Sequence, residues 1–387
     1  MRGKGPLYVL TAVFLIVAMG TLAGCGSKGT STAGSAVKIG EFGPLTGDAA
    51  TDGTDAKNGA TLAVEQINAA GGVLGSQLTL VAMDDEASAP EAMTVVQKLL
   101  EQEKVVALLS GSYSTPTKTV SPVVQAAKTP EIVEYATNAD ITKGGNYIFR
   151  TIYSGPTQGA AVADYAVQDK GYKKFAVLYT NDDYGVGNGQ AFSAEVTKLG
   201  GKVLISRNYV GGTKDFNAIL TAVKATNPDA IYVGSYYNEA AQICSQAKQL
   251  GLTAQILGDD GFDSPMLVQL AGTSAEGAVF SSPFSRSDPR KMVQDFITTY
   301  KARFNADPDM LSAQAFDSTL VLADAMKRAN SVTDKEAIRT ALSETKGFEG
   351  VTGTISFDAN NEVIKPVILM TVKDGKFVFL KYQTAAQ

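Results

Sequence analysis

The side chains in this chain that could do chemistry are small hydroxyls, tyrosines and aspartates that follow apolar segments. Ser112-Tyr113-Ser114-Thr115-Pro116 comes after one such segment and opens a helical pattern with proline in its first turn. Hydroxyls and free backbone N–H groups at a helix N-terminus suit an anion such as a carboxylate. The alternative interpretation is that Ser114 or Thr115 only caps its own helix.

Four further clusters of polar side chains follow predicted strands. An ordinary turn is an equally good interpretation of the first, and a strand-to-helix turn with an N-cap aspartate explains the second. In the fourth, a carboxylate could bind an ammonium group or a cation, but no third metal ligand has suitable spacing. The clusters are Tyr135-Ala136-Thr137-Asn138, Asn181-Asp182-Asp183-Tyr184-Gly185, Tyr236-Tyr237 and Asp259-Asp260-Gly261.

The composition argues against most enzyme and cofactor chemistry. The chain has no histidine, which removes Ser-His-Asp and Cys-His catalysis and every histidine-ligated metal site. Asp84-Asp85-Glu86 is interpreted as a solvated strand end rather than a metal cluster. The sequence contains no dinucleotide-binding fingerprint and no Walker loop. We therefore expect no enzyme, no metal and no cofactor, with carboxylate-only glycosidase chemistry as the remaining enzymatic alternative.

Length and charge limit the classes of protein and partner. The 387 residues are 44% apolar and 19% charged, which is typical of a globular protein with two or three domains. Lysine and arginine number 34 against 39 aspartates and glutamates, a formal net charge of −5. Because there is no basic excess to bind a phosphate backbone, nucleic acid is not an expected partner.

From residue 37 onward, strand-like and helix-like segments alternate in two series, which predicts an α/β protein with parallel sheets and right-handed crossovers. Two series imply two doubly wound lobes, whose ligands lie beyond the carboxyl ends of the strands, in the cleft between the lobes. Asp374-Gly375 marks a turn near the C-terminus. The main predicted strands are 37–43, 77–83, 105–110, one ending at Tyr135, 174–180, 230–234, 353–357, 367–372 and 377–382.

The first residues predict export from the cytoplasm. Arg2 and Lys4 precede an apolar run over 7–19 that is too short to span a bilayer. Leu22-Ala23-Gly24-Cys25 resembles the lipobox of bacterial lipoproteins, which implies a signal peptide over 1–24, a lipid on Cys25 and a tether over 25–36. An ordinary secretory signal with a chance cysteine is the alternative. With Cys25 lipidated, Cys244 is expected to be a buried, unpaired thiol.

Several segments match one known family. They are IGEFGPLTGDAATDG at 39–53, GATLAVEQINAAGGVLG at 59–75, NDDYGVG at 181–187 and DFNAILTAVKATNPDAIYVGSYYNEAAQICSQAKQLGL at 215–252. The chain resembles the leucine/isoleucine/valine-binding-protein family, the extracytoplasmic receptors of branched-chain amino-acid ABC importers. The resemblance, which covers 37–387, implies two Rossmann-like lobes joined by a three-segment hinge, the type I periplasmic-binding-protein fold. The lobes would be 37–155 with 284–361 and 156–283 with 362–387.

The resemblance also implies a function and partners. The protein would be a monomer that is anchored to the membrane by lipid, binds an amino acid and delivers it to permease subunits and their ATPases. At matching positions, Ser114 and Thr137 would hold the amino-acid carboxylate. The Tyr135 carbonyl and the Asp260 carboxylate would hold the ammonium group.

The remaining matching positions do not decide which side chain the ligand carries. Tyr184 and Tyr236 would close over the ligand from the second lobe. The chain departs from the family at Asp52, where members often have an aromatic residue near the side-chain pocket, and at Tyr113, which is bulkier than usual. We expect a branched-chain or other aliphatic amino acid. The alternative ligands are a short amide, urea or a small organic or aromatic acid, and a ligand without an amine would not need Asp260. The alternative function is that of a sensor without transport.

Overall fold

The computed structural model describes residues 36–383 of the chain. The predicted signal peptide, Cys25 and all but the last residue of the predicted tether lie outside the described residues. Within the described part, no helix combines the length and the apolar character needed to cross a membrane.

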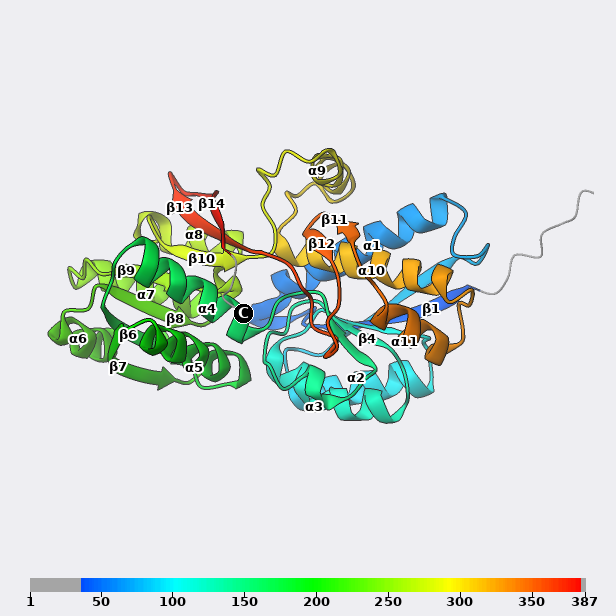
Figure 1. Ribbon diagram of the computed structural model, residues 1–387, viewed down its shortest axis with the longest axis horizontal. Coiled ribbons are helices and arrows are strands. Elements are labelled where there is room, and N and C mark those ends of the chain that lie inside the picture. Colours follow the sequence, from blue (N-terminus) through cyan, green and yellow to red (C-terminus); the bar gives the residue numbers. More distant parts are fainter. Residues whose placement is uncertain (1–35, 384–387) are drawn as a thin grey trace, which may run out of the picture. The chain divides into compact units, whose positions relative to one another are not determined.

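The first sheet is parallel throughout, with strand order β2-β1-β3-β4-β5. Successive residues of its strands point to opposite faces, so Leu108 packs with α2 and α3 while Leu109 packs with α1, α10 and α11. Figure 1 shows these strands and helices, mostly in blue and cyan. The elements are β1 (Val37–Gly43), α1 (Ala50–Ala69), β2 (Leu78–Asp84), α2 (Ala89–Glu101), β3 (Leu108–Ser110), α3 (Ser114–Ala126), β4 (Glu131–Val133), β5 (Ile148–Arg150), α10 (Met310–Arg328) and α11 (Lys335–Ser343).

The second sheet repeats this order as β7-β6-β8-β9-β10 and then adds two antiparallel strands, β13 and β14. Helices α4 and α5 cover one face, and α6, α7 and α8 cover the other. The elements are α4 (Gly155–Asp164), continued by a π-helix over Tyr165–Asp169, β6 (Lys174–Thr180), α5 (Asp183–Lys198), β7 (Lys202–Tyr209), α6 (Asn217–Thr226), β8 (Ala230–Gly234), α7 (Tyr237–Gln249), β9 (Gln255–Gly258), α8 (Pro265–Ala271), β10 (Val279–Ser282), β13 (Val367–Lys373) and β14 (Lys376–Gln383).

The chain passes between the two sheets three times. The connections are residues 151–154 between β5 and α4, residues 283–290 between β10 and α9 (Lys291–Phe304), and residues 356–366 between β12 and β13. A small hairpin of β11 (Phe348–Gly350) and β12 (Gly353–Ile355) precedes the third connection. We keep 37–155 with 284–361 and 156–283 with 362–387 as the proposed extents of the lobes.

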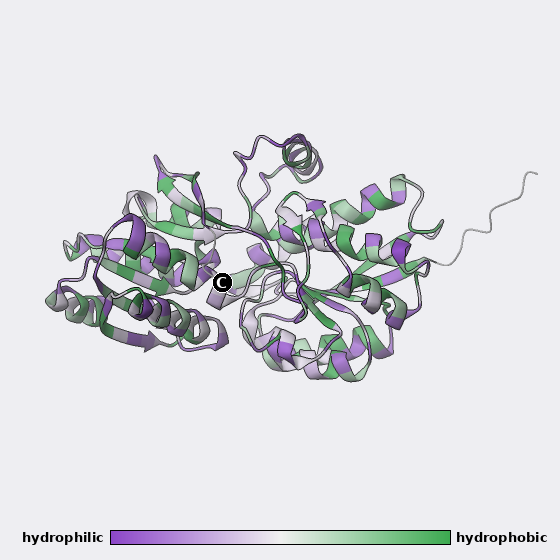
Figure 2. Ribbon diagram, viewed as in Figure 1, coloured by the Kyte–Doolittle hydropathy of each residue, from purple (hydrophilic) through white to green (hydrophobic). Residues whose placement is uncertain are grey.

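The predicted α/β class is confirmed, with two corrections. The second sheet is not purely parallel, because the hairpin β13–β14 adds antiparallel strands at its edge. Strand β7 was not predicted: it is an edge strand whose residues are mostly hydrophilic (Figure 2) and mostly part-exposed, so it lacks the apolar signal of a buried strand. The predicted turn at Asp374-Gly375 is confirmed, with positive φ at both residues.

Cys244 is a buried thiol on α7, and no disulfide partner is found for it within the described residues. Burial in the apolar core between α7 and the second sheet raises the pKa of the thiol to about 12. The predicted buried thiol is therefore confirmed, and its chemistry is inert at neutral pH.

Candidate functional site

The clusters singled out in the sequence all lie at the carboxyl ends of strands. In each sheet the strand order reverses between two neighbouring strands, β1 and β3 in the first sheet and β6 and β8 in the second. Such reversals create a crevice in which ligands bind. The first sheet contributes Ser114, which begins α3 after β3, together with Tyr135 and Thr137 after β4; the second contributes Tyr184 after β6, Tyr236 after β8 and Asp260 after β9.

The Ser114 hydroxyl does not cap its own helix. The N-cap of α3 is Tyr113, whose side chain makes no capping hydrogen bond, and Ser114 Oγ accepts a hydrogen bond from the Asn138 backbone N–H at 3.3 Å. Thr115 Oγ1 accepts from the Asp183 backbone N–H at 3.4 Å. The capping alternative is therefore wrong.

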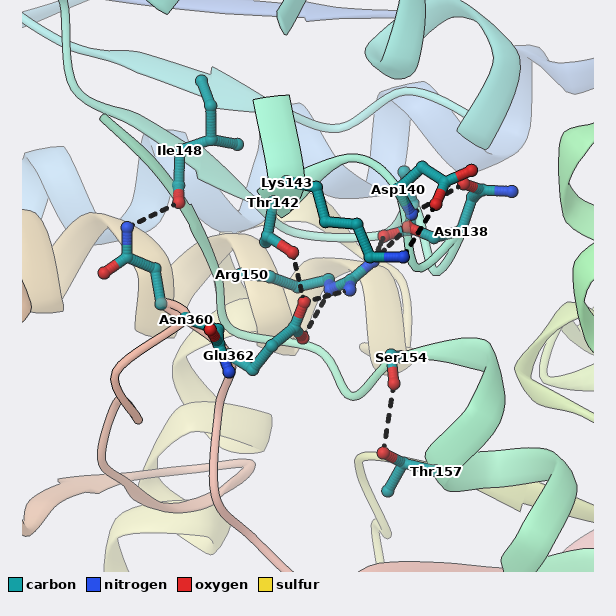
Figure 3. Close-up of polar contacts among 12 residues, drawn as sticks. Asn138, Asp140, Thr142, Lys143, Ile148, Arg150, Ser154, Thr157, Asn360 and Glu362 are labelled. Carbon is teal, nitrogen blue, oxygen red and sulfur yellow. Dashed lines mark hydrogen bonds and ion pairs between the residues drawn. The ribbon is translucent and has the colours of Figure 1, made fainter. Parts of the chain in front are cut away.

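Thr137 is held rigidly while its hydroxyl stays uncommitted. Arg150 Nη1 donates to the carbonyls on either side, Ala136 at 3.2 Å and Asn138 at 2.7 Å (Figure 3). The Gly155 backbone N–H, at the start of α4, donates to the Thr137 carbonyl at 2.7 Å. Thr137 Oγ1 is buried and makes no hydrogen bond within residues 36–383. The loop thus presents a preorganised hydroxyl beside Ser114.

Arg150 also ties this loop to the third connection between the sheets. Its side chain is fully buried and forms a fork with the Glu362 carboxylate, with Nε 3.0 Å from Oε2 and Nη2 bonded to Oε1. The Thr142 hydroxyl also donates to Glu362, as Figure 3 shows. Arg150 was not among the predicted site residues, although one arginine within the apolar run 147–153 is the kind of signal that marks a buried polar contact.

Asp260 opens a short 3₁₀ turn after β9 and is completely buried. Its Oδ1 accepts from the Tyr184 hydroxyl at 2.9 Å, and its backbone N–H donates to Gln158 Oε1 at 3.2 Å. Oδ2 is buried and has no hydrogen-bond partner in the described part of the chain. Burial raises the pKa of Asp260 to about 6, while the side chains of Gln158 and Tyr184 act in the opposite direction.

Four tyrosines, which we call the tyrosine cluster, pack against one another between the two sheets: Tyr113, Tyr135, Tyr184 and Tyr236. The ring of Tyr236 stacks on that of Tyr113 at 4.1 Å and on that of Tyr184 at 4.5 Å, and Tyr135 lies edge-on to Tyr113 at 5.4 Å. Burial raises the pKa of all four hydroxyls well above the usual range, so they stay neutral. Since Tyr113 and Tyr135 follow strands of the first sheet and the other two follow strands of the second, the cluster joins both halves of the site.

Polar contacts between segments that follow the two sheets hold the site closed. Lys118 Nζ lies 2.7 Å from Asp183 Oδ1, and the Asn138 amide donates to the Asp183 carbonyl at 2.7 Å. The Tyr237 hydroxyl donates to the Asp48 carbonyl at 3.0 Å. A groove of about 880 Å³ opens beside Thr137, and a second of about 710 Å³ is lined by Tyr113 and Tyr236.

Two other aspartates from the polar clusters, Asp85 and Asp182, have structural roles. Asp85 is fully buried and accepts a hydrogen bond from the Ser112 hydroxyl, so the interpretation of 84–86 as a solvated strand end is wrong at this residue. Ser112 is therefore committed to Asp85 rather than to the site. Asp182 is the N-cap of α5 and accepts from the Gly185 backbone N–H at 2.7 Å, which confirms that alternative. Among residues 36–383, no acidic cluster is arranged to hold a metal ion.

Residues 36–376 match the family described as periplasmic binding protein. The chain belongs to this family. The two doubly wound lobes and three connections are those of its type I fold, and members bind solutes outside the cytoplasm rather than catalyse reactions. This periplasmic binding protein is accordingly an extracytoplasmic binding protein and not an enzyme.

Named relatives of this binding protein share most of its length. A leucine-, isoleucine-, valine-, threonine- and alanine-binding protein of Pseudomonas aeruginosa is 31% identical over 336 residues, 86% of this chain and 88% of that one. A leucine-binding protein of Thermotoga maritima superposes with a TM-score of 0.86 at 33% identity, covering 90% of this chain and 99% of that one. The LivJ substrate-binding protein of Streptococcus pneumoniae, solved with isoleucine, gives 0.82 at 35% identity, with 88% and 97% covered.

Replacing Arg150 tests how much its hydrogen bonds to the loop that carries Thr137 and to Glu362 contribute to stability. Arg150→Met leaves the Glu362 carboxylate without its cation and frees two carbonyls, so we expect a loss of about 3–5 kcal/mol in the free energy of unfolding. Urea denaturation measures the loss. The matched control is Arg303→Met, which breaks an ion pair with Glu65 on the surface and should have a much smaller effect. Equal losses in the two variants would contradict the role of Arg150.

Proposed function

We propose that the protein is the substrate-binding lipoprotein of an ABC importer and that it binds an α-amino acid with a branched-chain or other aliphatic side chain. Two observations support the proposal: the Thr137 hydroxyl and Asp260 Oδ2 are buried without a hydrogen-bond partner among the described residues, and the Ser114 backbone N–H and Asp260 both act on the pKa of Tyr236, so they flank the same ring. A zwitterion leaves water at a high cost, so each of its charges needs a dedicated partner.

The α3 end of the cleft fits a carboxylate. Ser114 begins the helix, so its backbone N–H is one of those that have no partner within the helix. That N–H lies close enough to the Tyr236 hydroxyl to lower its pKa against the effect of burial, so it faces the second lobe. With the hydroxyls of Ser114 and Thr137, it forms a set of donors beside the positive end of the helix dipole.

The Asp260 end fits an ammonium group. The carboxylate is fixed by Tyr184 through Oδ1 and by Gln158 through its backbone, which leaves Oδ2 as an acceptor. Asp260 also raises the pKa of Tyr135, so this residue, whose carbonyl we assign to the same ammonium group, is nearby. A carboxylate at a buried site, from which water is excluded, binds an ammonium group more strongly than a neutral acceptor does.

Tyr184 and Tyr236 would close over the ligand from the second lobe. The contact of Lys118 with Asp183 and that of Tyr237 with Asp48 favour the closed arrangement. Hinged closure around a small ligand is a recurrent transition in two-lobed proteins. The names of the relatives, which include binding proteins for leucine, isoleucine and valine, support an amino acid as the ligand.

The same relatives support delivery to a permease and its ATPases, since one of them is named as the substrate-binding protein of a branched-chain amino acid transporter. We infer a monomer that is anchored to the membrane through lipid on Cys25 and extends into the extracytoplasmic space on its tether. A short amide, urea, a small acid without an amine, or a sensor without transport would be the conclusion if the tests below fail.

Asp260→Asn tests the ammonium partner. The substitution removes the negative charge and keeps the shape, so the dissociation constant for the best aliphatic amino acid should rise about 30-fold, or about 2 kcal/mol. Calorimetry measures it. The matched control is Asp259→Asn at the adjacent buried carboxyl, which accepts a hydrogen bond from Tyr232 and whose pKa burial raises well above the usual range. Unchanged binding in Asp260→Asn would refute the assignment.

The affinity should also depend on pH in one direction. Because burial raises the pKa of Asp260 to about 6, the carboxylate that binds ammonium is present above this pH and is protonated below it. The dissociation constant should be nearly constant from about pH 8 to pH 7 and then rise by up to about tenfold per unit below pH 6. Calorimetry across this range tests it, and Asp260→Asn should abolish the rise. A profile that is flat in the native protein would argue against an ammonium ligand.

Cys25→Ser tests the anchor. We expect the native full-length protein to partition into the detergent-rich phase of a Triton X-114 extraction, because two acyl chains suffice for stable membrane attachment. The serine variant should remain in the aqueous phase. Cys244→Ser is the control with the other cysteine changed, and it should partition like the native protein. Finding the native protein in the aqueous phase would indicate an ordinary secretory signal.

A further inference from the structure

We infer that Asp52 recognises the side chain of the ligand, so that the site prefers an α-amino acid whose side chain carries a hydrogen-bond donor over its apolar isostere. The inference rests on the proposed function, since it presupposes an amino acid bound between Asp260 and α3. It adds a property of the ligand that the fold and the zwitterion site do not determine.

Asp52 lies in the first turn of α1, directly after β1, and only 1% of it is exposed. The start of the helix packs closely against the loop after β1: a Cβ atom on the neighbouring Gly53 would lie 2.0 Å from the Pro44 carbonyl oxygen. The glycine therefore allows a close approach of α1 to the loop after β1. Asp52 is held by this packing at the edge of the crevice where the first sheet reverses its strand order.

One oxygen of the Asp52 carboxylate is used and the other is not. Oδ2 accepts a hydrogen bond from the Tyr113 hydroxyl at 2.8 Å. Oδ1 is buried and has no hydrogen-bond partner among the residues that the structure describes. A buried acceptor without a partner is costly, and a ligand that supplies a donor would remove this cost.

The surroundings of Asp52 increase its demand for a donor. Burial raises its pKa to about 7; the negative charges of Asp309 and Asp260 add to this shift, and hydrogen bonding from the Tyr113 and Tyr135 hydroxyls opposes it. Both charged groups that act on Asp52 are acidic, so the protein provides no cation for it there. Asp260 is the residue assigned to the ammonium group, which places the two carboxylates in one electrostatic environment.

The tyrosine cluster connects Asp52 to the proposed zwitterion site. Tyr113, which donates to Asp52, stacks on Tyr236, and Tyr236 stacks in turn on Tyr184, which donates to Asp260. The two carboxylates thus lie at the two ends of one stack of rings. An amino acid has one ammonium group, which Asp260 takes, so among the groups of the ligand it is the side chain that can supply a donor to Asp52.

Threonine and valine provide the decisive comparison, because they have nearly the same size and differ in a hydroxyl against a methyl group. Sites built to bond a hydroxyl strongly reject the analogue that lacks it, since their own polar groups are left unpaired. In calorimetry at pH 8, we expect threonine to bind the native protein at least about tenfold more tightly than valine. Homoserine against norvaline is a second pair, with the hydroxyl farther from the α-carbon.

Two variants separate recognition of the ligand from support of Tyr113. Asp52→Leu removes both carboxylate oxygens at similar volume, so the preference for threonine over valine should fall to about onefold. Tyr113→Phe keeps the ring stack and leaves Asp52 charged, so it should retain the preference. Thermal unfolding confirms that each variant is folded.

The outcomes distinguish the two proposals. Valine binding as tightly as threonine to the native protein would overturn the role of Asp52, and so would a preference for threonine that survives Asp52→Leu. In either case the amino-acid receptor would stand. If neither amino acid of either pair, nor any other aliphatic amino acid, bound the native protein, the proposed function itself would fall and the role of Asp52 with it.

Discussion

The buried guanidinium of Arg150 is the constraint on which the site depends. A fully buried arginine is tolerated only if its donors are satisfied, and here the carbonyls of Ala136 and Asn138 and the carboxylate of Glu362 satisfy them. One side chain therefore fixes the loop that carries Thr137, the end of β5 and the third connection between the lobes. Movement of that connection during opening or closure must be coupled to the position of the loop.

The site combines two opposite electrostatic environments within one closed crevice. The N-terminus of α3 provides donors and a positive dipole, whereas Asp260 provides an acceptor that burial keeps free of water. Exclusion of water makes each partnership stronger than it would be at the surface, because the effective dielectric constant is lower. The neutral tyrosines around the crevice supply this exclusion without adding competing charge.

The scaffold and the specificity of the site have different origins. Under the proposed function, the zwitterion would lie at the strand ends, where the type I fold itself creates a crevice. Asp52 and Tyr113 are side chains laid over that frame. Under our proposal, changing them would alter which side chain the crevice accepts, while the backbone at the strand ends would stay the same.

The sequence by itself determined the α/β class, the two series of strands, the C-terminal hairpin and the polar clusters at strand ends, because these depend on local periodicity and turn chemistry. It could not show that β7 is a polar edge strand, that Asp85 is buried, or that Ser114 bonds Asn138 rather than its own helix. Arg150 and Glu362 are 212 positions apart in the chain, so their pairing has no local signal. Only the tertiary structure decided such contacts, because the burial and the partners of a side chain are set by segments that the fold brings beside it.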